Sequence, residues 1–239
     1  MLGGGRMGTA ISALLPNSTK VHVFSRLRED NLNAFSEILQ NCDGVIDFSN
    51  PNNIEFAITA CLQTKKPFFC GTTGLSEAQN NALKTAGDHI PVLYAANTSL
   101  GIVVLKKIAS LVAKTLGTNT DIEIAEVHHR HKKDAPSGTA LAIGETIADS
   151  LGYKLEQIQS WDRQHPRSLN VPEIGFTSLR GGNVVGKHSV HFFHGDETIS
   201  LTHECLNRNI FAEGAIKAST WLFAQKPGFY TLENMLNLE

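Results

Sequence analysis

The chain has 239 residues, of which 41% are hydrophobic and 18% are charged, and its formal net charge is -2. This composition is typical of a soluble globular protein with one large domain or two smaller ones, and the near-balanced charge argues against nucleic acid as a partner. No apolar run reaches transmembrane length and no signal peptide precedes the first motif, so we expect a cytoplasmic protein without membrane contact. The cysteines are scattered, at positions 42, 61, 70 and 205, which predicts reduced core residues and no metal centre.

A glycine-rich turn opens the chain. Gly3, Gly5 and Gly8 fit the pattern G-x-G-x-x-G, and an apolar run with helical spacing follows at 9–15. In this motif the glycines allow a tight turn, the close approach of a pyrophosphate and close packing of the next helix. Only Met1 and Leu2 precede the turn, so the expected first strand is truncated, supplied by another segment or missing from this numbering. The expected cofactor contacts in the turn are Gly3, Gly5, Arg6 and Met7.

Strand-like and helix-like segments alternate after this turn. We expect strands at 20–24, 44–48, 67–70 and 91–95, and helices at 53–62 and 77–86. This βαβ alternation predicts an α/β fold with a Rossmann-like, doubly wound parallel sheet.

The end of the second expected strand bears on the choice of cofactor. Sites for the unphosphorylated ribose usually place an acidic residue there, whereas this chain has Ser25 and Arg26. A hydroxyl and a guanidinium suit a ribose 2′-phosphate, so we expect NADPH in preference to NADH. The alternative is that Arg26 is only a solvated residue at the end of the strand.

Two further loops follow later strands and should line the nicotinamide end of the cofactor, because ligands of open α/β sheets bind beyond the carboxyl ends of the strands. Ordinary turn chemistry is the alternative, since these residue types are common in loops. The expected contacts are Gly71, Thr72 and Thr73 in the first loop, and Ala95, Ala96, Asn97 and Thr98 in the second.

The second half of the chain predicts a different architecture. Helix-like runs at 102–116 and 139–151 flank a strand at 121–127, and strands at 184–193 and 197–203 meet at a Gly-Asp turn. This pattern indicates a second α+β domain built on a mainly antiparallel sheet, whose open face or edges could pair between subunits. A helix at 211–223 and a tail at 230–238 should return to the first domain. The expected domains are 1–99 with 209–239, for the dinucleotide, and 100–208, for substrate and oligomerisation.

The densest cluster of basic and titratable side chains lies where the strand at 121–127 ends. Residues 128–133 hold three histidines, an arginine and two lysines. Ser137 is placed to cap the next helix, which leaves the N–H groups of Gly138 and Thr139 facing an anion. The lysines suit a substrate with more than one carboxylate, and a histidine among them is a natural general acid. This cluster predicts an anion site with a proton donor beside it.

Two other interpretations of the cluster stay open. The histidines could bind zinc, but neighbouring strand residues point to opposite faces and the lysines repel a cation. A solvated basic turn is also possible. We therefore favour a substrate site and expect no metal.

The run from His128 to Ala140 resembles the signature of the 4-hydroxy-tetrahydrodipicolinate (dihydrodipicolinate) reductase family. Shorter segments match this family in order, at 5–8, 47–49, 71–74, 95–97, 173–176, 180–182 and 207–211. The resemblance implies a homotetramer, joined through the sheets of the second domains, that uses NADPH or NADH to reduce a cyclic unsaturated dicarboxylate to tetrahydrodipicolinate.

The resemblance also implies roles for single residues. His128 would be the proton donor and Lys132 its essential companion. The expected substrate contacts are His129, Lys132, Ser137, Gly138 and Thr139. Two departures concern the cofactor site: Leu2 occupies the place of the family's first glycine, and Thr98 stands where an aromatic residue is often found.

Two other functions remain as alternatives. A related dehydrogenase of an amino-acid semialdehyde or a sugar would share the glycine turn without needing the histidine cluster. A non-enzymatic dinucleotide sensor would tolerate loss of His128 and Lys132, and their presence argues against it.

Overall fold

The computed structural model describes residues 1–25, 27, 29–161 and 172–238. It divides into two compact units, one made of Met1–Leu100 with Asn209–Glu239 and the other of Gly101–Arg208. We call them unit 1 and unit 2. Among the described residues, no helix is both long and apolar enough to cross a membrane.

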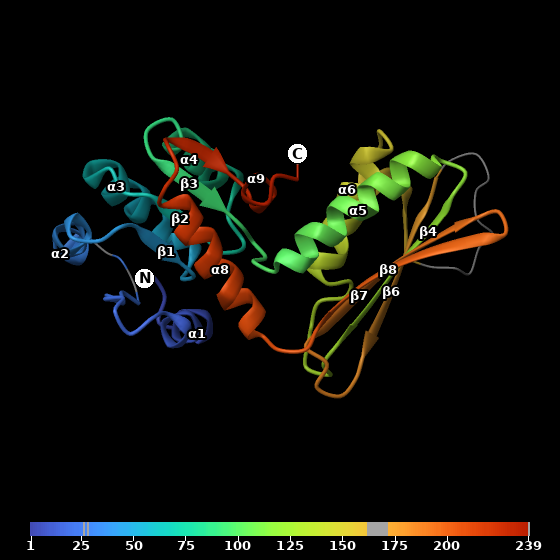
Figure 1. The fold of residues 1–239 in the computed structure, drawn as a ribbon, viewed down its shortest axis with the longest axis horizontal. Helices are drawn as coiled ribbons and strands as arrows, with labels where there is room; N and C mark the ends of the chain where they lie inside the picture. Colours follow the sequence, from blue (N-terminus) through green and yellow to red (C-terminus); the bar gives the residue numbers. More distant parts are fainter. Residues whose placement is uncertain (26, 28, 162–171, 239) are drawn as a thin grey trace. The chain divides into compact units, whose positions relative to one another are not determined.

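Unit 1 contains a four-stranded parallel sheet with helices around it, which confirms the Rossmann-like prediction (Figure 1). The strand order is β1-β2-β3-β9, and every neighbouring pair is parallel. The strands are β1 (Val45–Asp47), β2 (Phe68–Cys70), β3 (Pro91–Tyr94) and β9 (Gly228–Tyr230). The helices are α1 (Arg6–Leu14), α2 (Glu29–Gln40), the short 3-10 helix η1 (Pro51–Asn53), α3 (Ile54–Thr64), α4 (Glu77–Ala86), α8 (Asn209–Leu222) and α9 (Leu232–Met235).

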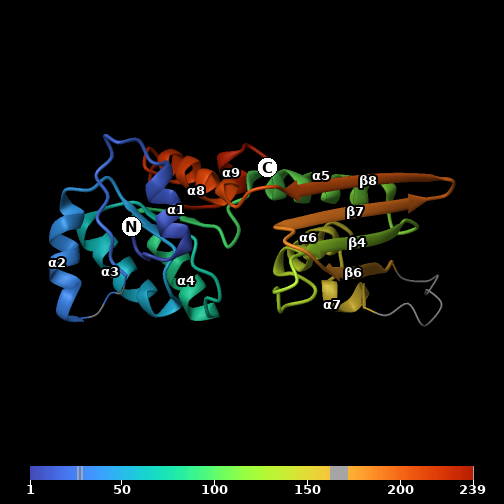
Figure 2. The ribbon, with the colours of Figure 1, turned by 90° about the horizontal axis from the view of Figure 1, so that it is seen from below.

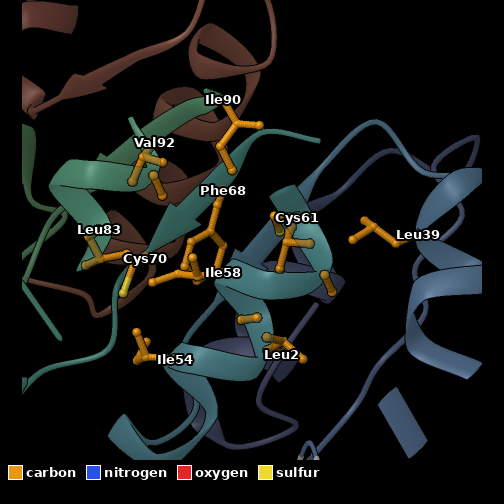
Figure 3. Packing of buried hydrophobic residues seen from close by; sticks show 14 of the residues in the cluster. Leu2, Leu39, Ile54, Ile58, Cys61, Phe68, Cys70, Leu83, Ile90 and Val92 are labelled. Atoms are coloured by element: carbon orange, nitrogen blue, oxygen red, sulfur yellow. The ribbon is translucent and has the colours of Figure 1, made fainter. Parts of the chain in front are cut away.

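Local sequence signals and apolar packing both shape unit 1. Helix α4 begins with a capping box, in which Ser76 Oγ accepts from Gln79 N and the Gln79 side chain accepts from Ser76 N. Apolar side chains of β2 and α3 pack in one hydrophobic cluster, in which Phe68, Ile58 and Cys61 lie close together (Figure 3). Near the end of the chain, β9 pairs with β3 in parallel and completes the sheet of unit 1.

The prediction of a strand at 20–24 was wrong. Only Phe24 pairs, through a bridge to Leu2, and Leu2 in turn bridges to Asp47. Leu2 is fully buried, and its N–H donates to Ile46 O at 2.8 Å. Among the described residues, the backbone hydrogen bonds to this segment join Met1 N to His22 O, Phe24 N to Met1 O and Gly3 N to Phe24 O. Residues before Phe24 are therefore left outside the sheet, and the Val23 side chain is 50% exposed.

Unit 2 contains a five-stranded sheet in the order β5-β6-β4-β7-β8. Figure 2 shows β6, β4, β7 and β8 side by side in this order. The strands are β4 (Asp121–His128), β5 (Gln159–Ser160), β6 (Ile174–Arg180), β7 (Gly186–His194) and β8 (Glu197–Cys205). The helices are α5 (Leu100–Leu116), α6 (Gly138–Ser150) and α7 (Leu155–Ile158).

This second sheet is mixed, and the antiparallel pairs β4–β7 and β7–β8 hold most of its paired residues, in line with the expected mainly antiparallel sheet. β4 pairs with β7, and β7 with β8, in antiparallel fashion, but β4 pairs with β6, and β6 with β5, in parallel. The reason is the connection between β4 and β6, which contains α6 and α7 and so returns the chain to the same end of the sheet. The sequence predicts no strand at β6, because the stretch around it is rich in Pro, Gly and Arg.

Alternation along β4 places core and polar residues on one face. Ile122 and Ile124 are buried against α6 residues such as Ile143, in the hydrophobic cluster of unit 2. Two residues further along, Glu126 and His128 point to the same face and are also buried. The polar site at the end of β4 is therefore continuous with the core, which restricts how its side chains can move.

Candidate active site

The glycine turn of unit 1 is held by backbone contacts that exclude side chains. Gly3 has φ +91°, and a Cβ there would lie 2.3 Å from Phe48 O. A Cβ on Gly8 would lie 1.9 Å from Gly3 O, so α1 packs directly on the turn. Gly5, at the start of α1, faces open space, since no described atom lies within 4 Å of a Cβ built there. These glycines fit the close approach of a dinucleotide pyrophosphate to a helix start.

The other residues expected near the cofactor differ in exposure. Arg6 is exposed and Met7 half-buried in the first turn of α1. Ser25 is exposed, and its Oγ lies 3.3 Å from a Cβ built on Gly4, so it borders the turn. Arg26 lies outside the described residues.

A buried carboxylate joins two of the strand-end loops. Asp47 accepts from Ser49 Oγ at 2.5 Å and from Thr72 Oγ1 at 2.8 Å. Thr72 Oγ1 also accepts from Ser49 N at 3.0 Å. Burial raises the pKa of the Asp47 carboxyl, against the effect of these hydrogen bonds. The Thr72 hydroxyl is therefore engaged in fixing the loops, whereas its neighbour Thr73 is exposed.

The loop after β3 is fastened to α8. Thr98 is buried, and its Oγ1 donates to Phe211 O at 2.7 Å. A Cβ on Gly214 would lie 1.9 Å from Thr98 O, so α8 and the loop touch backbone to backbone. Asn97 Oδ1 accepts from Ser99 N at 2.9 Å. Of the other expected contacts in this loop, Ala96 is exposed and Ala95 is buried.

In unit 2, the buried His128 is paired with a carboxylate on its own strand. His128 Nδ1 lies 2.5 Å from Glu126 Oε2, and Glu126 is 1% exposed. Gly186 on β7 lies beside the other side of the ring, where a Cβ would come within 2.9 Å of Nε2. Only glycine leaves the His128 ring in this position.

Arg180 holds the same carboxylate from the neighbouring strand β6. Its Nη1 donates to Glu126 Oε2 at 2.8 Å and its Nη2 to Glu126 Oε1 at 2.6 Å. Nη2 also donates to Asp134 O at 2.6 Å, so Arg180 reaches the loop that follows His128. Burial alone would raise the pKa of the Glu126 carboxyl, but hydrogen bonds from Arg180 and His128 lower it to about 2. Glu126 is a permanent anion at neutral pH.

Helix α6 begins beside this group, with Ser137 as its cap as predicted. Ser137 Oγ accepts from Ala140 N at 3.1 Å and lies 2.9 Å from His188 Nε2. Ser137 N donates to Glu126 Oε1 at 3.2 Å. Gly138 is exposed, and no described atom lies within 4 Å of a Cβ built there. The start of α6 is thus fixed on one side and open on the other.

The basic loop between His128 and α6 carries the remaining predicted residues. Lys132 Nζ lies 2.8 Å from Asp134 Oδ2, and this hydrogen bond lowers the pKa of the Asp134 carboxyl. His129 is half-buried, with its ring 6.2 Å from that of the exposed His131. Thr139 is half-buried in the first turn of α6.

Sequence reasoning missed three residues of this group: Glu126, Arg180 and His188. Glu126 had a visible signal, because it is a charged residue at an inward position of an alternating strand. Arg180 lies in a segment that resembles the family, at 180–182, but received no role, and His188 had no signal, since the proximity of both depends on the pairing of β4 with β6 and β7.

We expect His188 to make the stability of the protein depend on pH. Burial, followed by the neighbouring His128, lowers the pKa of His188 to about 4. The unfolded chain therefore binds more protons than the folded one between about pH 6.5 and pH 4, so the free energy of unfolding falls as pH falls through this window. From pH 7 to pH 4.5 the loss from this group should be about 2 kcal/mol. Urea unfolding across this range measures it.

The matched variants are His188→Gln and His191→Gln, which lie on the same strand with opposite orientation. In His188→Gln the free energy of unfolding should lose about 2 kcal/mol less than in wild type between pH 7 and pH 4.5. In His191→Gln it should fall as in wild type. Equal slopes for wild type and His188→Gln would contradict the assignment.

A parallel-sheet unit with an open glycine turn, together with a unit that holds a buried histidine beside a helix start, is consistent with a two-domain NAD(P)H-dependent oxidoreductase. Residues 1–98 match the family model described as dihydrodipicolinate reductase, N-terminus, and residues 101–236 match that of its C-terminus. The chain therefore belongs to the dihydrodipicolinate reductase family, enzymes of lysine biosynthesis.

Individual relatives agree with this family. The chain is 44% identical over 207 residues to the 4-hydroxy-tetrahydrodipicolinate reductase of a Nitratiruptor species, and the match covers 86% of this chain and 81% of the relative. It is 48% identical over 199 residues to that of Zymomonas mobilis subsp. mobilis, covering 82% and 78%. A solved structure, the dipicolinate-bound dihydrodipicolinate reductase from Paenisporosarcina sp. TG-14, has the same fold with a TM-score of 0.78. Its identity is 23%, and the match covers 98% of this chain and 97% of that chain.

Proposed function

We propose that this chain reduces 4-hydroxy-tetrahydrodipicolinate to tetrahydrodipicolinate, with unit 1 binding the dinucleotide and unit 2 binding the substrate. The observation that carries the proposal is the group at the end of β4, where His128 lies beside the open start of α6. A dicarboxylate needs a site for its charges, and its reduction needs a proton donor. The names of the relatives point to the same reaction.

The substrate carboxylates would bind at the start of α6 and along the basic loop. Gly138 and Thr139 lie in the first turn of this helix, where the Gly138 backbone hydrogen-bonds to the Asp134 carboxyl, and His129 and Lys132 carry side-chain donors. Lys132 is paired with Asp134, so an arriving carboxylate would take the place of a carboxylate already present. Ser137 has its hydroxyl engaged with Ala140 and His188, and we assign it the role of shaping the turn.

His128 would supply the proton. A bound NADPH or NADH provides the hydride that the reduction requires. With Nδ1 directed at Glu126, the His128 ring keeps Nε2 for the substrate. Lys132 and the start of α6 would stabilise negative charge on the substrate as it develops, because their positive potential is in place before the reaction.

We also propose NADPH as the preferred cofactor and a homotetramer as the assembly, in the cytoplasm. The exposed hydroxyl of Ser25 beside the glycine turn supports the first, since it suits a 2′-phosphate. The outer face of the unit 2 sheet supports the second, because Leu179 and Phe193 are 57% and 43% exposed there. Light scattering on the purified protein measures the assembly.

The test of function is the oxidation of NADPH, and then of NADH, by the purified chain. Substrate is generated in place from pyruvate and aspartate semialdehyde by a coupling synthase. Absorbance loss that requires the synthase supports the proposed reaction, and the ratio of the two kcat/KM values gives the cofactor preference. Loss of absorbance with aspartate semialdehyde alone would favour a semialdehyde dehydrogenase. No oxidation by folded protein would reject the proposal.

A further inference from the structure

We propose that Glu126 is a positioning residue: it fixes the tautomer of His128, so that the proton leaves from Nε2, and it ties this acid to the start of α6. The inference rests on the proposed function, in which His128 is the proton donor. It concerns how the site is assembled, and it assigns a role to three residues, Glu126, Arg180 and Ser137, that form one connected group.

The first step is the contact between Glu126 and His128. An ionised carboxylate only accepts hydrogen bonds, so at 2.5 Å the Nδ1 atom of His128 must carry a proton. A protonated His128 can then lose its second proton only from Nε2. When it does, the Nε2–H bond breaks, a new bond to hydrogen forms on the substrate, and neutral imidazole with the proton on Nδ1 is left. Solvent restores the proton at Nε2.

The second step is the clamp on Glu126 itself. A carboxylate that is 1% exposed would be costly without partners, and Arg180 supplies two donors from the fork of its guanidinium. The parallel pairing of β4 with β6 places Arg180 opposite His128 in register. Both oxygens of Glu126 are thereby held, and the carboxylate cannot rotate away from the histidine.

The third step is the link to the helix start. Glu126 Oε1 also accepts from Ser137 N at 3.2 Å. Ser137 caps α6, directly before Gly138 and Thr139 in the proposed carboxylate site. One carboxylate therefore sets the position of the proton donor and of the anion-binding turn. A displacement of Glu126 would alter both at once.

The test compares Glu126→Gln and Glu126→Asp. Gln preserves size but lacks the charge, and its amide can donate to Nδ1, which favours the proton on Nε2 in neutral His128. Asp preserves the charge on a shorter side chain. We expect Gln to lower kcat by roughly 100-fold and Asp by roughly 10-fold, with smaller changes in KM for the cofactor. If Glu126 had only a structural role, kcat would fall further in Glu126→Asp than in Glu126→Gln, since Gln fits the space better.

Nitrogen NMR of histidine-labelled protein gives the second readout. The chain has 10 histidines, and the signals of His128 are identified by their loss in His128→Gln. In wild type at high pH we expect protonated Nδ1 and unprotonated Nε2. In Glu126→Gln the two should exchange. Glu204→Gln is the control, because its exposed pair with Lys187 lies on the opposite face of the sheet from Glu126 and His128, and it should change neither kcat nor the tautomer.

The outcomes separate this inference from the proposed function. Wild-type kcat and an unchanged tautomer in Glu126→Gln would overturn the inference. Wild-type kcat in His128→Gln would reject His128 as the donor, while the NMR comparison would still decide whether Glu126 sets the tautomer. If Glu126→Gln does not fold, Arg180→Lys replaces it: it keeps the charge, loses the fork and should lower kcat, and unchanged kcat would overturn the clamp.

Discussion

His128→Gln is expected to lower kcat by roughly 100- to 10,000-fold, because it removes the proposed general acid. The KM for NADPH or NADH should stay within about twofold of wild type, since the glycine turn and the strand-end loops belong to unit 1 and keep their own hydrogen bonds. Glutamine is close to histidine in size and can still hydrogen-bond to Glu126. The loss therefore reports on proton transfer more than on packing. Steady-state kinetics with the coupling synthase in excess measure both constants.

His131→Gln is the matched control for this variant. It makes the same chemical change three residues further on, at an exposed position in the loop that follows His128. We expect its kcat to remain within about twofold of wild type. Similar losses in the two variants would point to a general effect of histidine in the loop and would remove the specific role of His128.

Lys132→Ala should weaken substrate binding and slow turnover together. The lysine would contact a carboxylate in the ground state and stabilise charge in the transition state, so both KM and kcat should change. Truncating one member of a buried charge pair typically costs about 2–5 kcal/mol, which corresponds to a loss in kcat/KM of roughly 30- to 5,000-fold. Lys132 is 22% exposed, so we expect the lower end of this range. The measurement is kcat/KM for the substrate at fixed ionic strength.

Lys133→Ala separates a specific contact from the general positive field of the loop. It removes the same charge from the adjacent, exposed residue. We expect a change in kcat/KM of less than about threefold, and this change should shrink further at high salt. Wild-type kinetics for Lys132→Ala would take Lys132 out of the site.

Elements with strong local signals were predictable from the sequence. Helix α4 has a capping box, and α6 has a serine cap followed by an apolar run, so both were expected close to their observed positions. Strand β3 is a short apolar run bounded by proline. In each case the information lies within a few residues of the element.

Elements that depend on distant partners were not predictable in the same way. Residues 20–24 have the pattern of a strand but pair only through the bridge of Phe24 to Leu2, as far as the described residues show, whereas β6 lacks the pattern but is held between β4 and β5. The same distinction applies to the residues of the site. His128 and Lys132 stand out in the sequence because the basic loop is dense in charge, whereas Arg180 and Glu126 are 54 positions apart and meet only because β4 pairs with β6.

The division of unit 1 into two stretches of sequence determines the order in which the protein can be completed during synthesis. Unit 2 is continuous and lies between them, so a ribosome finishes it before α8 and β9 exist. Until then, β3 has an unpaired edge and the loop at Thr98 lacks its anchor on α8. Unit 1 is thus begun first and finished last. For as long as translation of unit 2 takes, the free edge of the unit 1 sheet can pair with other strands.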